Sequence, residues 1–109
     1  MSEVCEVVIT APDLEWLTRF SRRLVEDRLC AAAHVSEMRS TYQWEGRVHN
    51  KAEGRVALHT RQSLVSRIVE RTNREHPYEV PCVVAVPIVD GAPAYVQWIL
   101  SETSDHPTA

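Results

Sequence analysis

The residues best placed to do chemistry are one histidine and two carboxylates that lie close together in the sequence. His76 directly follows Glu75 and is separated from Glu79 by Pro77 and Tyr78. Imidazole nitrogens and carboxylate oxygens are donors that copper(II) and zinc accept in proteins. The set therefore predicts a weak site for a divalent metal, with further groups supplied by a neighbouring subunit at a cleft.

His76 also has a structural interpretation. Pro77 disfavours the α conformation at the residue before it, so a helix is expected to end at His76. An imidazolium at that position is favoured by the helix dipole and can bond to the free carbonyls of the last turn. Both interpretations, ligand and helix cap, remain open from the sequence.

Other signals of chemistry are weak. The chain contains no Gly-x-Ser-x-Gly, no His-Glu-x-x-His and no glycine-rich phosphate loop, and it has only three glycines. Cys5, Cys30 and Cys82 are widely spaced and form no Cys-x-x-Cys pair, so we expect each to be a buried, unreactive thiol. His59 is expected to be a packing or interface residue. We therefore expect no catalytic activity.

Composition limits the classes of partner. The 109 residues are 44% hydrophobic and 25% charged, which is typical of one globular domain over residues 1–109. A formal net charge of −3 without a basic cluster argues against nucleic acid. The sequence has no basic leader and no apolar run of about 18 residues, so we expect a cytoplasmic protein without a membrane partner.

Apolar periodicity predicts an alternation of strands and helices. Strands are expected over residues 4–10, 40–44 and 82–87, with a return strand that begins at residues 47–49 and resumes over 55–60, and helices are expected over residues 13–28 and 63–75 and from Pro93. Within residues 40–49 the Glu45-Gly46 turn makes a hairpin, which the polar residues 50–54 interrupt. The alanines at 31–33 alone favour helix, and the tail from Ser101 is expected to fray.

The order of these elements predicts an α+β, ferredoxin-like fold. Strand, helix, two strands, helix and strand give a four-stranded antiparallel sheet with two helices on one face, here followed by a short C-terminal helix. A swapped or extended variant of the same topology is the alternative.

Several phrases, in order over residues 4–103, resemble the CutA family of divalent-cation tolerance proteins. The matching segments are residues 10–13, 28–33, 40–47, 59–61, 76–81, 87–88, 91, 95 and 98–99. The resemblance implies a ferredoxin-like protomer whose long second and third strands reach across neighbours to build a homotrimer. It also implies a role in the response to metal ions.

The same resemblance argues against a metal site of high affinity. Some members have a cysteine immediately before the Thr-Ala-Pro-Asp phrase and a second histidine before the His-Pro-Tyr phrase. Here those positions are Ile9 and Glu75, so only His76 of that ligand set remains. Weak or indirect binding of copper or a similar divalent metal is therefore the expectation, with His76, Glu75 and Glu79 as ligands.

Aromatic residues are the expected contact surface between the subunits. Aromatics are enriched at the buried centres of interfaces, and a long hairpin leaves strand edges that another copy can pair. We expect the interface or cleft to include Tyr42, Trp44, Glu45, Tyr78 and Trp98. The alternative is that these aromatics belong to the core of one chain.

A second function is compatible with the same fold. The PII signalling proteins also form ferredoxin-like trimers, and they sense small molecules or protein partners. By this analogy the chain would be a PII-like sensor, with the segment around His76 as the wall of a ligand cleft.

Overall fold

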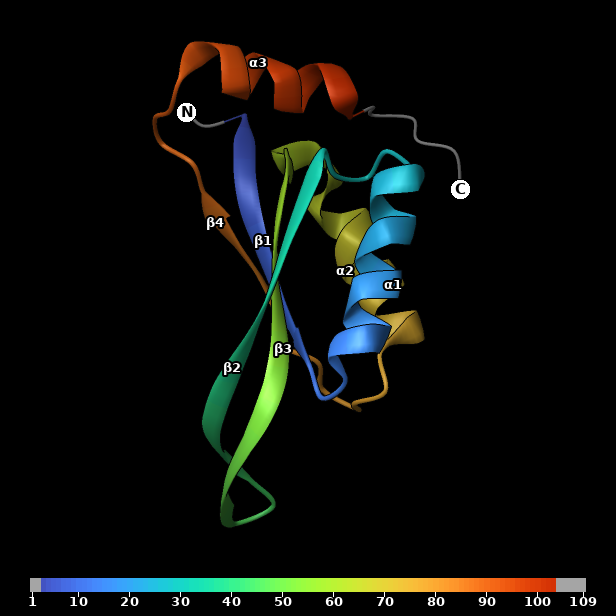
Figure 1. The fold of residues 1–109 in the computed structure, drawn as a ribbon, viewed down its shortest axis with the longest axis vertical. Helices are drawn as coiled ribbons and strands as arrows, with labels where there is room; N and C mark the ends of the chain where they lie inside the picture. The colour runs from blue at the N-terminus through green and yellow to red at the C-terminus, as the bar shows by residue number, and fades with distance from the viewer. Residues whose placement is uncertain (1–2, 104–109) are drawn as a thin grey trace.

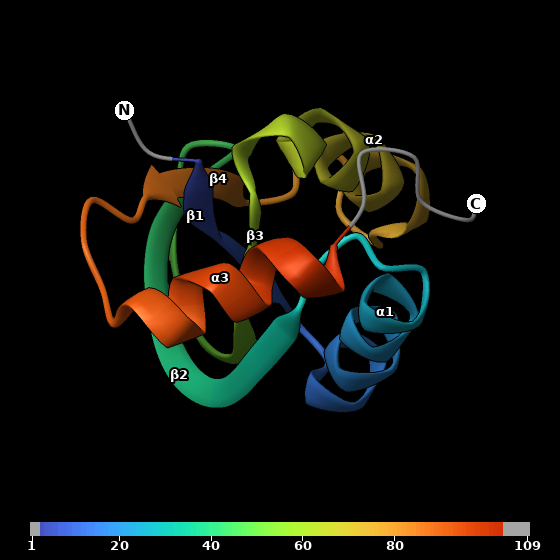
Figure 2. The ribbon, with the colours of Figure 1, turned by 90° about the horizontal axis from the view of Figure 1, so that it is seen from above.

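The computed structural model describes residues 3–103 and contains one four-stranded antiparallel sheet in the order β2-β3-β1-β4. The elements in chain order are β1 (Val4–Ala11), α1 (Leu14–Glu26), β2 (Ala32–Trp44), β3 (Arg47–Arg61), the 3₁₀ turn Gln62–Leu64, α2 (Val65–Glu75), β4 (Val83–Pro87) and α3 (Pro93–Glu102). Helices α1 and α2 cover one face of the sheet, and α3 lies across its end (Figures 1 and 2). The predicted ferredoxin-like α+β fold is confirmed.

Strand alternation explains which face the helices cover. Val7 and Ile9 of β1 lie opposite Leu58 and Val56 of β3, and all four side chains are fully buried. They pack against the apolar face of α1, of which Phe20 is the largest member. The side chains between them, such as Glu6, point to the opposite face, since successive residues of a strand alternate. We call that opposite side the open face.

Three predictions about element boundaries are wrong. β2 begins at Ala32 rather than at residue 40, because it pairs with β3 from Ala32 onward and this pairing overrides the helix propensity of the alanines. Residues 50–54 do not interrupt β3, because each of them is paired with β2. Residues 101–102 are helical rather than frayed, while the tail beyond Thr103 lies outside the described residues.

The cysteines divide into two groups. Cys5 and Cys30 are buried, as predicted, and burial raises the pKa of the Cys30 thiol to about 12, so it is protonated at neutral pH. Cys82 is exposed just before β4, so the prediction that it is buried is wrong. No helix among residues 3–103 has the length and apolarity needed to cross a bilayer.

The hairpin of β2 and β3 extends well beyond the rest of the sheet. β1 pairs with β3 only from Gly54 to Arg61, whereas β2 pairs with β3 along its whole length. Residues 38–53 therefore form a projecting two-stranded ribbon, visible below the helices in Figure 1. Its tip is a two-residue turn in which Glu45 and Gly46 both have positive φ, as a type I′ turn requires. We call residues 38–53 the ribbon.

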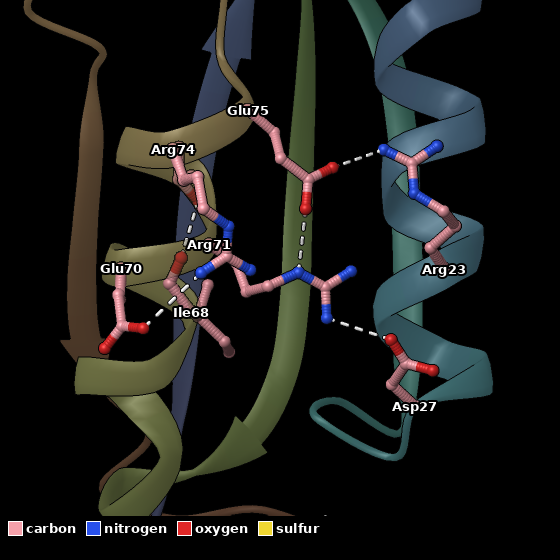
Figure 3. A network of polar contacts seen from close by, with 8 residues as sticks. Arg23, Asp27, Ile68, Glu70, Arg71, Arg74 and Glu75 are labelled. Carbon is pink, nitrogen blue, oxygen red and sulfur yellow. Dashed lines mark hydrogen bonds and ion pairs between the residues drawn. The ribbon is translucent and has the colours of Figure 1, made fainter. Parts of the chain in front are cut away.

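Helices α1 and α2 are joined by a network of ion pairs (Figure 3). Glu75 at the end of α2 accepts from Arg23 of α1 at 2.6 Å and from Arg71 at 2.9 Å. Arg71 also donates to Asp27, just after α1, at 2.9 Å. Partial burial acts to raise the pKa of Glu75, but the hydrogen bonds and charges of the two arginines outweigh it and lower the pKa below the ordinary 4.5.

This lowered pKa predicts a pH-dependent contribution to stability. Because the pKa of Glu75 is lower in the folded chain, the network stabilises the fold above pH 4.5 and loses this effect as the pH falls through the folded pKa. At pH 7 and fixed protein concentration, Glu75→Gln should lower the free energy of unfolding by about 1–2 kcal/mol, as measured by denaturant titration.

The difference between wild type and Glu75→Gln should shrink at pH 3. Glu70→Gln is the matched control, because Glu70 is also on α2 but its side chain is 76% exposed and pairs only loosely with Arg74, at 3.5 Å. It should change the stability by less than about 0.5 kcal/mol. An equal deficit for Glu75→Gln at both pH values would contradict the assigned role of its charge.

Candidate functional site

His76 is held between two backbone groups. Its ring Nε2 is 2.7 Å from the carbonyl oxygen of Thr10, and its Nδ1 is 3.0 Å from the amide nitrogen of Tyr78. A carbonyl only accepts and an amide N–H only donates, so Nε2 carries the proton and Nδ1 accepts. Both nitrogens of this neutral ring are therefore in use, and neither has a lone pair free for a ligand.

The surroundings of His76 are aromatic. The buried ring packs edge-on against Trp16 of α1, with centroids 5.3 Å apart, and lies 5.2 Å from the ring of Tyr78. As expected, α2 ends at His76, whose N–H bonds to the carbonyl of Thr72. The expectation that an imidazolium bonds the helix carbonyls is wrong, because the neutral ring bonds the carbonyl of Thr10 in β1 instead.

The three predicted metal ligands do not converge in one chain. The carboxylate of Glu75 is taken up by Arg23 and Arg71, and Glu79 is exposed on the segment after His76. Residues 3–103 contain no group of three histidine, cysteine, aspartate or glutamate side chains arranged to hold a metal ion. The predicted site stays a prediction that concerns the assembled protein.

A groove of about 780 Å³ lies between the ribbon and the segment 77–82 that connects α2 to β4. Three of the predicted interface or cleft residues, Tyr42, Trp44 and Tyr78, line it together. Glu45 lies at the turn of the ribbon and Trp98 on α3, and neither lines the groove. The remaining lining residues are Thr10, Met38, Ser40, Thr41, Gln43, His49, Lys51, Glu53, Pro77, Glu79, Val80, Pro81 and Cys82.

The polar centre of the groove is Glu53. Glu53 is 6% exposed and carries the only buried carboxylate among residues 3–103. The hydroxyl of Tyr78 donates to its Oε2 at 2.9 Å. Burial is the largest cause that raises the pKa of Tyr78, and the hydrogen bonds and charges of Glu53 and Tyr42 raise it further. The phenol therefore stays protonated and keeps donating. Lys51 lies over the ring of Tyr78, 5.7 Å from its centroid.

The sequence interpretation missed Glu53. It lies in the polar stretch 50–54, which we expected to interrupt the strand. Once β3 is continuous, alternation places Glu53 on the same face as Lys51, two residues earlier. The only available signal was this alternation, because the partner Tyr78 is distant in sequence.

A second polar cluster lies on the open face, beneath α3. The Nδ1 of His59 is 2.5 Å from the hydroxyl of Tyr95, and its Nε2 is 2.9 Å from a carboxylate oxygen of Glu6. The ring of His34 packs edge-on against His59, with centroids 5.0 Å apart. Burial, followed by the charge of Glu6, raises the pKa of Tyr95. His59 thus packs within the chain and joins β1, β3 and α3.

Comparison with known proteins gives a family. The family model for "CutA1 divalent ion tolerance protein" matches residues 5–102. The chain is 36% identical over 104 residues to the divalent-cation tolerance protein CutA of Thermus thermophilus, covering 94% of this chain and 99% of that protein. It is 35% identical over 98 residues to the chloroplastic CutA of Arabidopsis thaliana, covering 89% of this chain and 54% of that protein. The chain thus spans about half the length of the plant relative.

Solved structures agree with this result. CutA1 from Oryza sativa superposes with a TM-score of 0.91 at 30% identity, covering 96% of this chain and 97% of that one. CutA1 from Thermus thermophilus gives a TM-score of 0.88 at 32% identity, covering 93% and 99%. The chain therefore belongs to the CutA1 family of divalent ion tolerance proteins.

Proposed function

We propose that the chain acts as a non-catalytic homotrimer that contributes to divalent-cation tolerance. The observation that carries the assembly is the uncovered open face of the sheet. Val84 and Val86 of β4 are 53% and 50% exposed there, although they lie in a regular strand. Apolar surface of this kind on a sheet is typical of an interface.

Strand edges support the same proposal. β2 and β4 are the outer strands of the sheet, and β2 leaves one side of the ribbon unpaired over its whole length. An isolated two-stranded hairpin is only marginally stable in water, and long exposed edges invite pairing. Other copies of the chain would cover both features, and the number three follows from the resemblance to the CutA family.

The assembly predicts a mass and a sensitive position. Light scattering should give about three times the chain mass of 12.4 kDa. Val86→Glu should lower this mass, because the new carboxylate would lie beside Glu6, its partner on β1, in the buried interface. Val89→Glu is the control, since Val89 is 91% exposed and lies after β4. A stable wild-type monomer would overturn the trimer.

The proposed contact with metal is weak or indirect. His76 would have to give up its bonds with Thr10 and Tyr78 before it could bind an ion. Ile9 cannot supply the soft thiolate that copper(I) prefers. Any ligand set formed by His76, Glu75 and Glu79 would need groups from a second subunit.

A calorimetric titration checks this interpretation. The metal-free assembly should bind copper(II) or zinc with a Kd of about 1 μM or weaker, and His76→Ala should reduce the binding further. Glu79→Gln should also weaken metal binding, whereas Glu70→Gln, which lies away from this segment on α2, should leave metal binding unchanged. Binding that His76→Ala leaves unchanged would make His76 purely structural. Binding far tighter than this would contradict the weak site.

One observation favours a second candidate function, that of a PII-like trimer that senses a small molecule. The groove of about 780 Å³ falls in the range of pockets that hold small ligands, roughly 300–1,000 Å³. It combines apolar walls with a few polar groups, as such pockets do. In the calorimetric experiment, heat from a nucleotide and none from metals would favour this candidate.

A further inference from the structure

We infer that the groove between the ribbon and residues 77–82 binds a small organic cation, an ammonium or guanidinium group on an apolar or aromatic body. This inference names the ligand class for the second candidate function and rests on it. All the residues that line the groove belong to one chain, so the inference requires that the assembly leaves this side of the ribbon open.

The first argument is the incomplete pairing of Glu53. Its Oε2 accepts from Tyr78, but its Oε1 accepts no hydrogen bond from residues 3–103, and no cation among them forms an ion pair with the carboxylate. Oε1 is not one of the fully buried atoms without a partner, so it is accessible to water and to a ligand. A nearly buried carboxylate is costly unless a positive group or several donors compensate it. A ligand cation at this point of the groove would supply the missing partner.

The second argument is the aromatic lining. Tyr42, Trp44 and Tyr78 line the groove, and the faces of aromatic rings attract cations. One face of the Tyr42 ring is stacked on His49, with centroids 5.3 Å apart. The ammonium of Lys51 already occupies one such position, over the ring of Tyr78. This contact shows that the site accommodates a positive group on a flexible stem. Trp44 also lines the groove and is 41% exposed in the single chain, so its ring offers a second position.

The third argument is charge. The charged groups that line the groove are the carboxylates of Glu53 and Glu79 and the ammonium of Lys51, which gives a balance of one negative charge. An anionic ligand would meet two carboxylates and is disfavoured. A bare metal ion is also disfavoured, because residues 3–103 offer no set of three donors for it.

The fourth argument is the apolar surface. Met38, Pro77, Val80 and Pro81 also line the groove and would contact the body of the ligand. Apolar walls with few polar groups favour ligands that carry their charge at one end. A cation without such a body would leave these walls in water.

Matched probes test the inference on the full assembled protein. Benzylammonium and phenylguanidinium should bind with a Kd of about 1 mM or tighter in calorimetry, while benzoate and benzyl alcohol, of similar size, should bind at least about tenfold more weakly. Glu53→Gln keeps the shape and the acceptor for Tyr78 but removes the charge. It should weaken binding of the cations about tenfold and leave benzyl alcohol unchanged.

Two further variants complete the design. Glu70→Gln removes a carboxylate outside the groove and should leave the Kd of both cations unchanged. Trp44→Leu changes a side chain outside the core of the chain and should weaken the cations more than benzyl alcohol, with light scattering used to select samples that keep the mass of the wild type. It keeps the test decisive if Glu53→Gln does not fold.

The outcomes separate the ligand class from the assembly. Equal affinity for benzoate and benzylammonium, equal affinity for benzyl alcohol, or full binding by a folded Glu53→Gln would overturn the inference. Failure of every probe to bind would do the same. Light scattering on the same samples reports the mass independently, so a monomer that binds the cations would overturn the trimer and support the groove.

Discussion

The rest of the structure depends on a sheet that is covered on one face only. Helices α1 and α2 bury one set of alternating side chains, represented by Val7, Ile9 and Leu58, and within residues 3–103 only α3 covers part of the other set. The cluster of Glu6, His59 and Tyr95 then fastens α3 across one end of the open face. The remaining exposed valines and the ribbon are what the proposed assembly would cover.

A second chain of contacts connects the core to the groove. His76 ends α2 and bonds the carbonyl of Thr10, which fixes the connection to β4 against the end of β1. Its other nitrogen accepts from the amide of Tyr78, and the hydroxyl of Tyr78 reaches Glu53 on the ribbon. One neutral histidine therefore positions the wall of the groove, which explains how a residue predicted as a ligand can matter through positioning.

Sequence reasoning predicted the elements whose burial is periodic. β1, α1 and α2 carry apolar residues at the spacing of their structure, so their type and order were predictable. The continuity of β3 was not, because residues 50–54 lie on the ribbon, where backbone pairing with β2 rather than burial keeps the strand extended. Because we expected residues 50–54 to interrupt the strand, we also missed Glu53.

The polar clusters were less predictable than the fold. His59 bonds to Glu6 and Tyr95, and Tyr78 bonds to Glu53. The partners are far apart in the sequence, so no local motif predicts these contacts. Tyr42, Trp44 and Tyr78, which were predicted as interface or cleft residues, line one groove, and the hairpin and the segment after His76 that carry them were both predicted. Glu45 and Trp98 lie outside the groove, and their predicted place at an interface between chains stays a prediction.

The central claim is that other copies of the chain cover the ribbon and the open face. Hydrogen exchange of the native protein, resolved by mass spectrometry on peptides from residues 38–53, tests it most directly. If the claim is right, the ribbon amides should exchange nearly as slowly as those of the central strand β1. Ribbon amides that exchange at rates close to those of an unfolded chain, while β1 stays protected, would contradict it.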